Sequence, residues 1–203
     1  MSARGAILAG GGATRFGGAR KGLEQVGGRR IIDRLAELLE GVLGEAPLLV
    51  ANDPGAAAWI PGLRVVPDVL SGAGSLGGIL TAVIEAPAPV VCVAWDMPFV
   101  TEALVRELAD GLTRADVCIP ESDGRRGVEP LCAGYGPGCR EPIERRIAAG
   151  DLRAIGFHPL VRVATIPAQR VTALGDPARM FFNVNTAQDL TQAELLWRRA
   201  SSP

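Results

Sequence analysis

Two aspartates stand where apolar segments end, at positions suited to binding a metal ion. Asp96 follows residues 90–94, and Asp68 follows residues 63–66. Both segments have the composition of buried strands, and open α/β sheets bind ligands beyond the carboxyl ends of their strands. Mg²⁺ is usually held by one or two carboxylates together with substrate phosphates. We therefore predict that Asp96 is a metal ligand and that Asp68 lies in the same site; the alternative for each is a helix cap or a loop acid.

A glycine-rich segment near the start of the chain carries two cations, Arg15 and Lys21. Residues 8–22 read LAGGGATRFGGARKG. Backbone amides of consecutive glycines can turn toward an anion, and the two cations supply charge for a polyphosphate. The segment is not a Walker A loop, because Gly22 stands where that motif needs serine or threonine. We predict a phosphate-binding loop, with a plain flexible turn as the alternative.

Lys21 is the single lysine of the chain, whose other 20 cations are arginines. A chain that uses arginine everywhere else tolerates arginine in general. A lysine at one position therefore indicates a need for a compact, mobile ammonium group rather than a planar guanidinium. We predict that this ammonium contacts a phosphate.

A second glycine cluster, at residues 72–77, matches the G-x-G-x-x-G pattern of dinucleotide-binding domains. It precedes a predicted helix, and Asp96 follows its last glycine by 19 residues. This pattern keeps an NAD(P)-dependent oxidoreductase open as an alternative. However, residues 67–71 separate the preceding strand from the first glycine, and this alternative leaves the N-terminal loop unexplained. Residues 1–30 and 72–78 together hold 13 of the 26 glycines.

Composition excludes several other classes of protein. The formal net charge is −1 and arginines are interspersed with acids, which argues against a nucleic-acid partner or an anionic membrane. No apolar run approaches the length of a membrane span. The four cysteines form no C-x-x-C pair, so we expect buried, reduced thiols and a cytoplasmic location. The single histidine, His158, excludes a zinc site of several histidines and is expected to be a packing or surface residue.

Short apolar runs alternate with segments of helical periodicity, which is typical of a mostly parallel α/β sheet. Strands are predicted at residues 5–9, 48–51, 63–66, 90–94, 117–119, 128–133 and 161–166. Helices are predicted at residues 31–43, 76–85, 101–112, 140–149 and 151–155, followed by a C-terminal helix capped by Thr186. The turn at residues 123–127 favours an antiparallel excursion. We predict one domain over residues 1–203, a three-layer Rossmann-like sheet with helices on both faces.

A glycine loop, a lysine, an arginine and a strand-end carboxylate are the parts of a nucleotidyl-transfer site. In these motifs the sequence resembles the molybdenum cofactor guanylyltransferases of the nucleotide-diphospho-sugar transferase superfamily. That family opens with L-A-G-G-x-x-x-R-M-G-G-x-x-K-G-L, which residues 8–23 match with Phe16 in place of methionine. Further matches are P-D at 67–68, G-S-L-G-G-I at 74–79, D-M-P-F at 96–99, E-P-L-C-A-G-Y at 129–135 and F-F-N-V-N-T at 181–186.

The resemblance implies transfer of GMP from GTP to the terminal phosphate of Mo-molybdopterin, with release of pyrophosphate. It implies catalytic roles for Arg15, Lys21 and Asp96, with Asp96 holding Mg²⁺ or, alternatively, Mn²⁺. It implies a nucleotide site formed by Leu8, Ala9, Gly10, Lys21, Asn52, Asp68 and Asp96. Asn183 and Asn185 are expected near the pterin. Other molybdenum cofactor biosynthesis or acceptor proteins are the expected protein partners.

Three alternatives to this function stay open at the level of sequence. The first is a related enzyme of the superfamily, either a cytidylyltransferase or a sugar-phosphate nucleotidyltransferase. The guanylyltransferases differ from their cytidylyltransferase relatives by Gly10-Gly11 where the latter have Ala-Gly, and this chain has the glycine pair. The second is the NAD(P)-binding oxidoreductase, and the third is a nucleotide-binding module without turnover.

Overall fold

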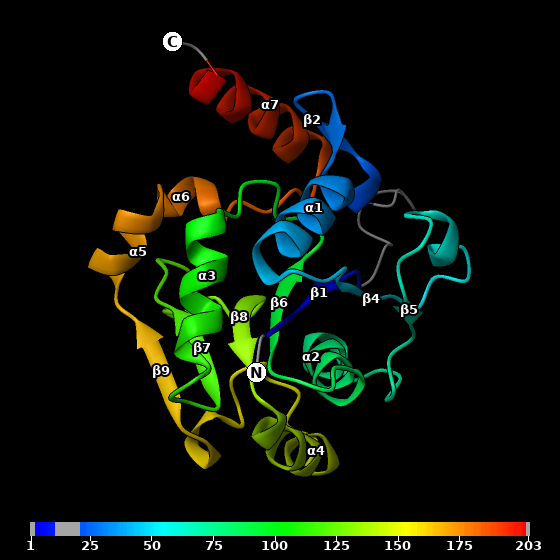
Figure 1. Cartoon of the computed structure of the whole chain (residues 1–203), viewed down its shortest axis with the longest axis vertical. Coiled ribbons are helices and arrows are strands. Elements are labelled where there is room, and N and C mark those ends of the chain that lie inside the picture. The colour runs from blue at the N-terminus through cyan, green and yellow to red at the C-terminus, as the bar shows by residue number, and fades with distance from the viewer. Residues whose placement is uncertain (1–2, 11–20, 202–203) are drawn as a thin grey trace.

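The computed structural model describes residues 3–10 and 21–201, and a sheet of seven strands forms its centre. The strands are β1 (Arg4–Leu8), β4 (Leu48–Val50), β5 (Val65–Val66), β6 (Val90–Ala94), β7 (Val117–Pro120), β8 (Cys132–Tyr135) and β9 (Val163–Ile166). Their order across the sheet is β5-β4-β1-β6-β8-β7-β9 (Figure 1). A small separate hairpin pairs β2 (Gln25–Val26) with β3 (Arg29–Arg30).

The sheet is parallel except at β8. β1 pairs in parallel with β4 and β6, β4 with β5, and β7 with β9. β8 lies between β6 and β7 and is antiparallel to both, which confirms the predicted antiparallel excursion. The carboxyl ends of β5, β4, β1 and β6 therefore meet at one edge of the sheet, where ligands of such folds bind.

Helices cover both faces of the sheet, as predicted. They are α1 (Ile31–Leu43), α2 (Gly74–Glu85), α3 (Glu102–Gly111), α4 (Arg140–Ala148), α5 (Ala168–Leu174), α6 (Pro177–Met180) and α7 (Ala187–Ser201). α1 packs beside α3 on one face, and α2 packs beside α4 on the other (Figure 1). α7 contacts the β2–β3 hairpin, so the end of the chain lies against a segment close to its beginning.

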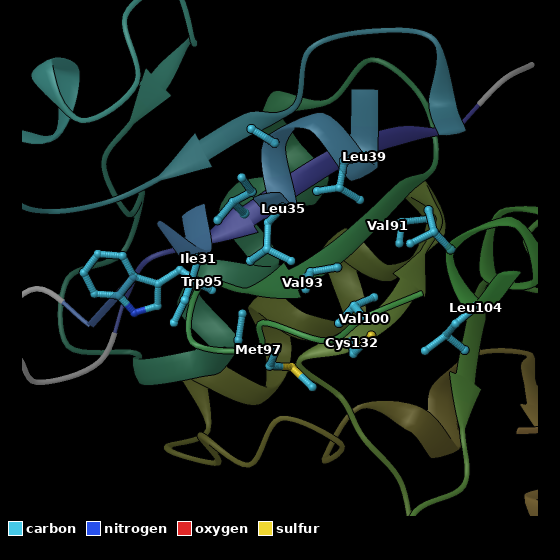
Figure 2. Packing of buried hydrophobic residues seen from close by; sticks show 14 of the residues in the cluster. Ile31, Leu35, Leu39, Val91, Val93, Trp95, Met97, Val100, Leu104 and Cys132 are labelled. Carbon is cyan, nitrogen blue, oxygen red and sulfur yellow. The ribbon is translucent and has the colours of Figure 1, made fainter. Parts of the chain in front are cut away.

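Two hydrophobic clusters fill the space between the sheet and its helices. Along the central strands, Ile7 and Val93 point to the cluster under α1, whereas Leu8 and Cys92 point to the cluster under α2. The central strands are thus buried on both faces, which explains why residues 90–94 are continuously apolar. Figure 2 shows the first cluster, in which side chains of α1 pack over those of β6.

The structure corrects two of the predicted elements. Residues 151–155 form turns instead of a helix, because the Asp151 carboxylate accepts the backbone N–H of Arg153 at 3.2 Å and competes with helical bonding. The strand predicted at residues 128–133 begins only at Cys132. Pro130 has no N–H to donate to a ladder, and Val128 forms just one isolated bridge, with Glu121.

Three short elements were not predicted from the sequence: the β2–β3 hairpin, α5 and α6. None is long enough to show hydrophobic periodicity. A local signal for α6 is present, since Asp176 caps it by accepting the N–H of Ala178 and Pro177 occupies its first position. The predicted cap of the C-terminal helix is confirmed, as the Thr186 hydroxyl accepts the N–H of Asp189 at 3.1 Å.

Within residues 3–10 and 21–201, no helix has both the length and the apolar character needed to cross a membrane.

Candidate active site

A pocket of about 440 Å³ opens at the carboxyl ends of β1 and β6. Leu8 at the end of β1, Gly10 just beyond it and Asp96 just after β6 line it, together with the start of α2. Residues from far along the chain, Asn183 and Asn185, complete its wall. The pocket lies at the point where successive connections leave the sheet on opposite faces, which is where open α/β sheets bind ligands.

The backbone at the end of β1 is fixed by its two neighbouring strands. The N–H of Ala9 donates to Val50 at 2.8 Å, and the carbonyl of Leu8 accepts the N–H of Trp95 at 3.2 Å. Gly10 is exposed beyond this point, and a Cβ added there would meet no heavy atom within 4 Å. The predicted residues Leu8, Ala9 and Gly10 therefore present a firmly held strand end and an open backbone to a ligand.

Asp96 is half-buried at the end of β6 and lines the pocket. Burial raises the pKa of its carboxyl group, and the positive charge of Lys21 acts in the opposite direction. Its backbone carbonyl accepts the N–H of the buried Val184 at 2.8 Å. That bond anchors the segment that carries Asn183 and Asn185, which flank Val184 and both line the pocket.

Lys21 contacts this same segment. Its Nζ donates to Oδ1 of Asn185 at 2.7 Å, a contact between residues 164 positions apart. The 3₁₀ turn Lys21–Leu23 lies against Trp95, whose ring is buried and stacks on Trp59 with centroids 5.1 Å apart. The structure thus brings Lys21 and Asp96 together, as the sequence predicts. Arg15 lies outside the described residues.

Gly22 is the residue that allows this turn to lie so close to the Trp95 ring. A Cβ at position 22 would stand 2.5 Å from a ring carbon of Trp95. We expect Gly22→Ala to displace Lys21 and to slow turnover at least about 10-fold, since overpacking of this kind shifts the backbone. Steady-state kinetics of the variant measure the effect. The matched control is Gly41→Ala in α1, where the added Cβ meets nothing within 4 Å and turnover should not change.

Asn52 and Asp68 form a reciprocal pair after β4 and β5. The Asn52 amide nitrogen donates to the Asp68 carboxylate at 2.8 Å, and the Asp68 N–H donates back to Oδ1 of Asn52 at 2.8 Å. They are at the predicted edge of the sheet, but neither lines the pocket itself. Asp68 stands behind its wall, 3.8 Å from where a Cβ on Gly78 would lie.

The second glycine cluster forms the loop that leads into α2. Gly74, with a φ of 58°, begins the helix in a conformation that other residues rarely adopt, and it lines the pocket with Ser75 and Gly78. The hydroxyl of Thr81 accepts the N–H of Val69 at 3.0 Å and so ties the loop to the helix. The N-terminus of α2, where the first backbone N–H groups have no partner within the helix, lies at the pocket and is a suitable environment for an anion.

Two side chains of this region were missed by the sequence analysis. Arg126 lines the pocket from the turn at residues 123–127. Glu129 follows that turn, and burial raises the pKa of its carboxyl group, against the opposing effects of the Leu131 backbone and Arg126. The available signal is the motif at 129–135, which supports the family resemblance but assigns no role to Glu129.

The cysteines and the histidine lie away from this site. All four thiols are buried and unpaired, as predicted, and burial raises the pKa of each. His158 packs edge-on against Phe157 with centroids 4.9 Å apart, and burial lowers the pKa of its imidazole. It is a packing residue, as expected.

The residues in the pocket fit a magnesium ion whose coordination is completed by oxygen atoms of a bound ligand. No cluster of three or more His, Cys, Asp or Glu side chains occurs in the described part of the chain, so no cage made of protein alone is present there. Mg²⁺ rarely uses such cages and instead combines one or two carboxylates with phosphate oxygens and water. Asp96 offers one half-buried carboxylate to a pocket that also has the start of α2 in its wall, which fits this mode of binding.

Comparisons with known proteins agree with this geometry. Residues 5–163 match the model of the MobA-like NTP transferase domain. The chain is 37% identical over 197 residues to a probable molybdenum cofactor guanylyltransferase of Pelotomaculum thermopropionicum, covering 97% of this chain and 94% of that protein. It is 34% identical to a molybdenum cofactor guanylyltransferase of Desulfosudis oleivorans, covering 94% and 93%.

A solved structure extends the similarity to the fold. The molybdopterin-guanine dinucleotide biosynthesis protein A of Archaeoglobus fulgidus superposes with a TM-score of 0.78 at 26% identity, over 97% of this chain and 99% of that one. This match confirms the predicted fold type. The G-x-G-x-x-G pattern at 72–77 lacks the strand–turn–helix context that a dinucleotide site needs. β5 ends at Val66, and Gly77 already lies inside α2.

Proposed function

The chain belongs to the MobA-like NTP transferase family and, within it, to the molybdenum cofactor guanylyltransferases. From this premise we propose that it transfers GMP from GTP to the terminal phosphate of Mo-molybdopterin and releases pyrophosphate. The observation that carries the proposal is the meeting of Lys21, Asn185 and Asp96 around one pocket at the carboxyl ends of β1 and β6.

We assign the nucleotide to the side of the pocket formed by β1, β4 and α2. In this assignment the backbone of residues 8–10 contacts the nucleotide. The first turn of α2 supplies N–H groups that bind its phosphates. The Asn52–Asp68 pair orders the loop behind this wall, because its two hydrogen bonds join the segments that follow β4 and β5. Their role is to hold the nucleotide-binding surface in shape.

The reaction needs little acid–base chemistry from the protein. A phosphate oxygen of the acceptor attacks the α-phosphorus of GTP, the bond from that phosphorus to the bridging oxygen breaks, and pyrophosphate leaves with the electron pair. The attacking phosphate is already ionised at neutral pH, so no histidine or serine base is required. What the protein must supply is alignment of the two phosphates and stabilisation of negative charge.

Lys21 and Arg15 provide the positive charge in this proposal. Asn185 holds the Lys21 ammonium on the Asp96 side of the pocket, through the 2.7 Å hydrogen bond to its Oδ1. A preorganised charge of this kind stabilises the transition state without a cost of reorganisation at the moment of reaction. Asp96 would hold Mg²⁺, or alternatively Mn²⁺, and the ion when bound neutralises phosphate oxygens around the reacting phosphorus.

We also propose the domain organisation, cellular location, substrates and partners of the protein. The chain acts as one nucleotidyltransferase domain, because a single sheet from β1 to β9 carries its helices and α7 packs back on β2. The four free thiols suit a reducing cytoplasm. GTP and Mo-molybdopterin are its substrates, and proteins that supply the molybdenum cofactor or receive the product are its partners.

The test is pyrophosphate release from the purified protein with GTP, Mg²⁺ and Mo-molybdopterin. We expect release that depends on all three components and stops when a chelator removes the metal ion. Release without the acceptor would indicate hydrolysis of GTP and would contradict the proposed transfer. Nucleotide binding without any release would identify a binding module in place of an enzyme.

A further inference from the structure

A second pocket adjoins the first, because both are lined by Asn183. It has a volume of about 320 Å³ and is lined by the turn after β7, by Glu129, and by α6 with the residue that follows it. We call it the acceptor pocket; its lining includes Ser122, Glu129, Ala178, Phe181 and Asn183. Asn183 also lines the first pocket, so the two pockets share a wall. One ligand could therefore extend from the acceptor pocket to Asp96.

Glu129 gives the acceptor pocket a carboxylate that is only half-exposed. Its backbone is fixed, since its N–H donates to Pro120 at 3.0 Å and its carbonyl accepts the N–H of Cys132 at 3.2 Å. The carboxyl group bears a desolvation penalty that raises its pKa. A ligand with adjacent N–H donors would offset that penalty, because charge-assisted hydrogen bonds are the strong ones in proteins.

The rest of the acceptor pocket suits a flat heterocycle. Pro177, Ala178 and the Phe181 ring form an apolar wall beside the carboxylate. The hydroxyl oxygen of Ser122 is buried and has no hydrogen-bond partner within the described part of the chain. A buried hydroxyl left unpaired is costly, so it marks a place where a ligand atom can bind. An apolar surface with a few polar groups at one edge is the usual form of a site for a small aromatic ligand.

We propose that the acceptor pocket binds the pterin ring of the acceptor, with the Glu129 carboxylate accepting hydrogen bonds from the 2-amino group and the adjacent ring N–H. This inference rests on the proposed function and assigns its acceptor site. A pterin carries these two donors side by side on one edge, and a carboxylate accepts both in bidentate fashion. The phosphate of the same molecule then points past Asn183 toward Lys21 and Asp96.

Guanine offers the same pair of donors, so the nucleotide base is the competing ligand for Glu129. The arrangement of the pockets favours the pterin. The phosphate-binding segments, at Leu8–Gly10 and the start of α2, lie in the first pocket, whereas the acceptor pocket is built from the turn after β7 and from α6.

The variant that tests this is Glu129→Leu, which keeps most of the side-chain volume and removes both acceptor oxygens. Equilibrium dialysis measures the binding of Mo-molybdopterin and, separately, of GTP to the full chain. We expect the Kd for Mo-molybdopterin to rise about 10- to 100-fold and the Kd for GTP to stay within about two-fold. Glu129→Gln, which keeps one acceptor and adds a donor, should fall between wild type and Glu129→Leu. Glu144→Leu on α4 is the matched control and should change neither Kd.

A second variant keeps the proposal testable if Glu129→Leu does not fold. Ala178 is exposed at the rim of the acceptor pocket, so Ala178→Trp should fold and fill the space intended for the ring. We expect the same selective loss of Mo-molybdopterin binding. An unchanged Kd for Mo-molybdopterin in the folded variants, or a raised Kd for GTP in its place, would overturn the assignment. The variants could lose acceptor binding selectively while the wild-type protein releases no pyrophosphate. That result would support the pocket assignment and would contradict only the proposed reaction.

Discussion

Replacing Asp96 with asparagine is expected to slow pyrophosphate release by about 10²- to 10³-fold, the usual cost of removing one preorganised charge from a transition-state site. Asparagine keeps the size of the side chain and loses its charge. The backbone carbonyl that holds Val184 is unaffected by the change, so the wall formed by Asn183 and Asn185 should stay in place. The measurement is the rate of release at saturating GTP, Mo-molybdopterin and Mg²⁺.

The stability of Asp96→Asn serves as its internal control. Burial disfavours the charged carboxylate, which is why the pKa of Asp96 is raised. Removing that charge should leave the Tm equal to or above that of the wild type, as at other sites where function costs stability. An inactive variant with an unchanged or higher Tm supports a role in chemistry. Nearly full activity would show that Asp96 does not hold the metal ion.

Replacing Lys21 with alanine is expected to have an effect of similar size, about 10²- to 10³-fold on turnover. The ammonium group contacts Oδ1 of Asn185 and acts on Asp96 across the pocket, so its loss removes positive charge from the place where phosphates meet. Lys21→Arg should restore only a small part of the activity, because a planar guanidinium cannot occupy the position of a compact ammonium. Single-turnover kinetics separate this effect from a change in binding.

Two further variants define what the Lys21 result means. Asn185→Ala leaves the charge and removes its anchor, so we expect a smaller loss, of about 10-fold. Arg64→Ala removes a cation that pairs with Glu85 on the outer surface and should leave turnover unchanged. If Arg64→Ala lowered turnover as much as Lys21→Ala, a general effect of net charge would explain both, and the assignment of Lys21 would be wrong.

The fold was largely predictable because its central strands and long helices carry strong local signals. Residues 90–94 are continuously apolar and coincide with β6, and the periodicity at 31–43 coincides with α1. Prediction was poor where the structure depends on contacts with a few polar groups. The side chain of Asp151 ends the helical pattern locally, and Pro130 delays the start of β8. Neither effect changes the hydrophobic pattern that predicts the elements.

The strand-end residues of the site follow from a general rule, whereas its distant residues Asn183 and Asn185 are expected only from the family resemblance. Asp96 and the Leu8–Gly10 backbone lie together because parallel strands end at one edge, a rule that can be applied to sequence alone. The contact between Lys21 and Asn185 joins residues 164 positions apart, and no local sequence pattern predicts it. The acceptor pocket with Glu129 is formed by a turn and a four-residue helix, elements too short to be read from periodicity.

The single lysine of the chain differs from the arginines in its surroundings. Twenty arginines serve a chain in which exposed ion pairs are common, such as those of Arg106 with Glu102 and Arg140 with Glu144. The one lysine lies beside the pocket, where its Nζ donates to Asn185, a residue of the pocket wall. This placement supports the proposed phosphate contact.

The most direct measurement is the identity of the product formed from Mo-molybdopterin when GTP, CTP, ATP and UTP are offered together with Mg²⁺. Mass spectrometry of the product distinguishes the four nucleotides in one reaction, and pyrophosphate release gives the amount formed. We predict a single product that carries GMP, formed in equal amount to the pyrophosphate and lost in Asp96→Asn. A product that carries CMP, or pyrophosphate release without any modified Mo-molybdopterin, would contradict guanylyl transfer by this site.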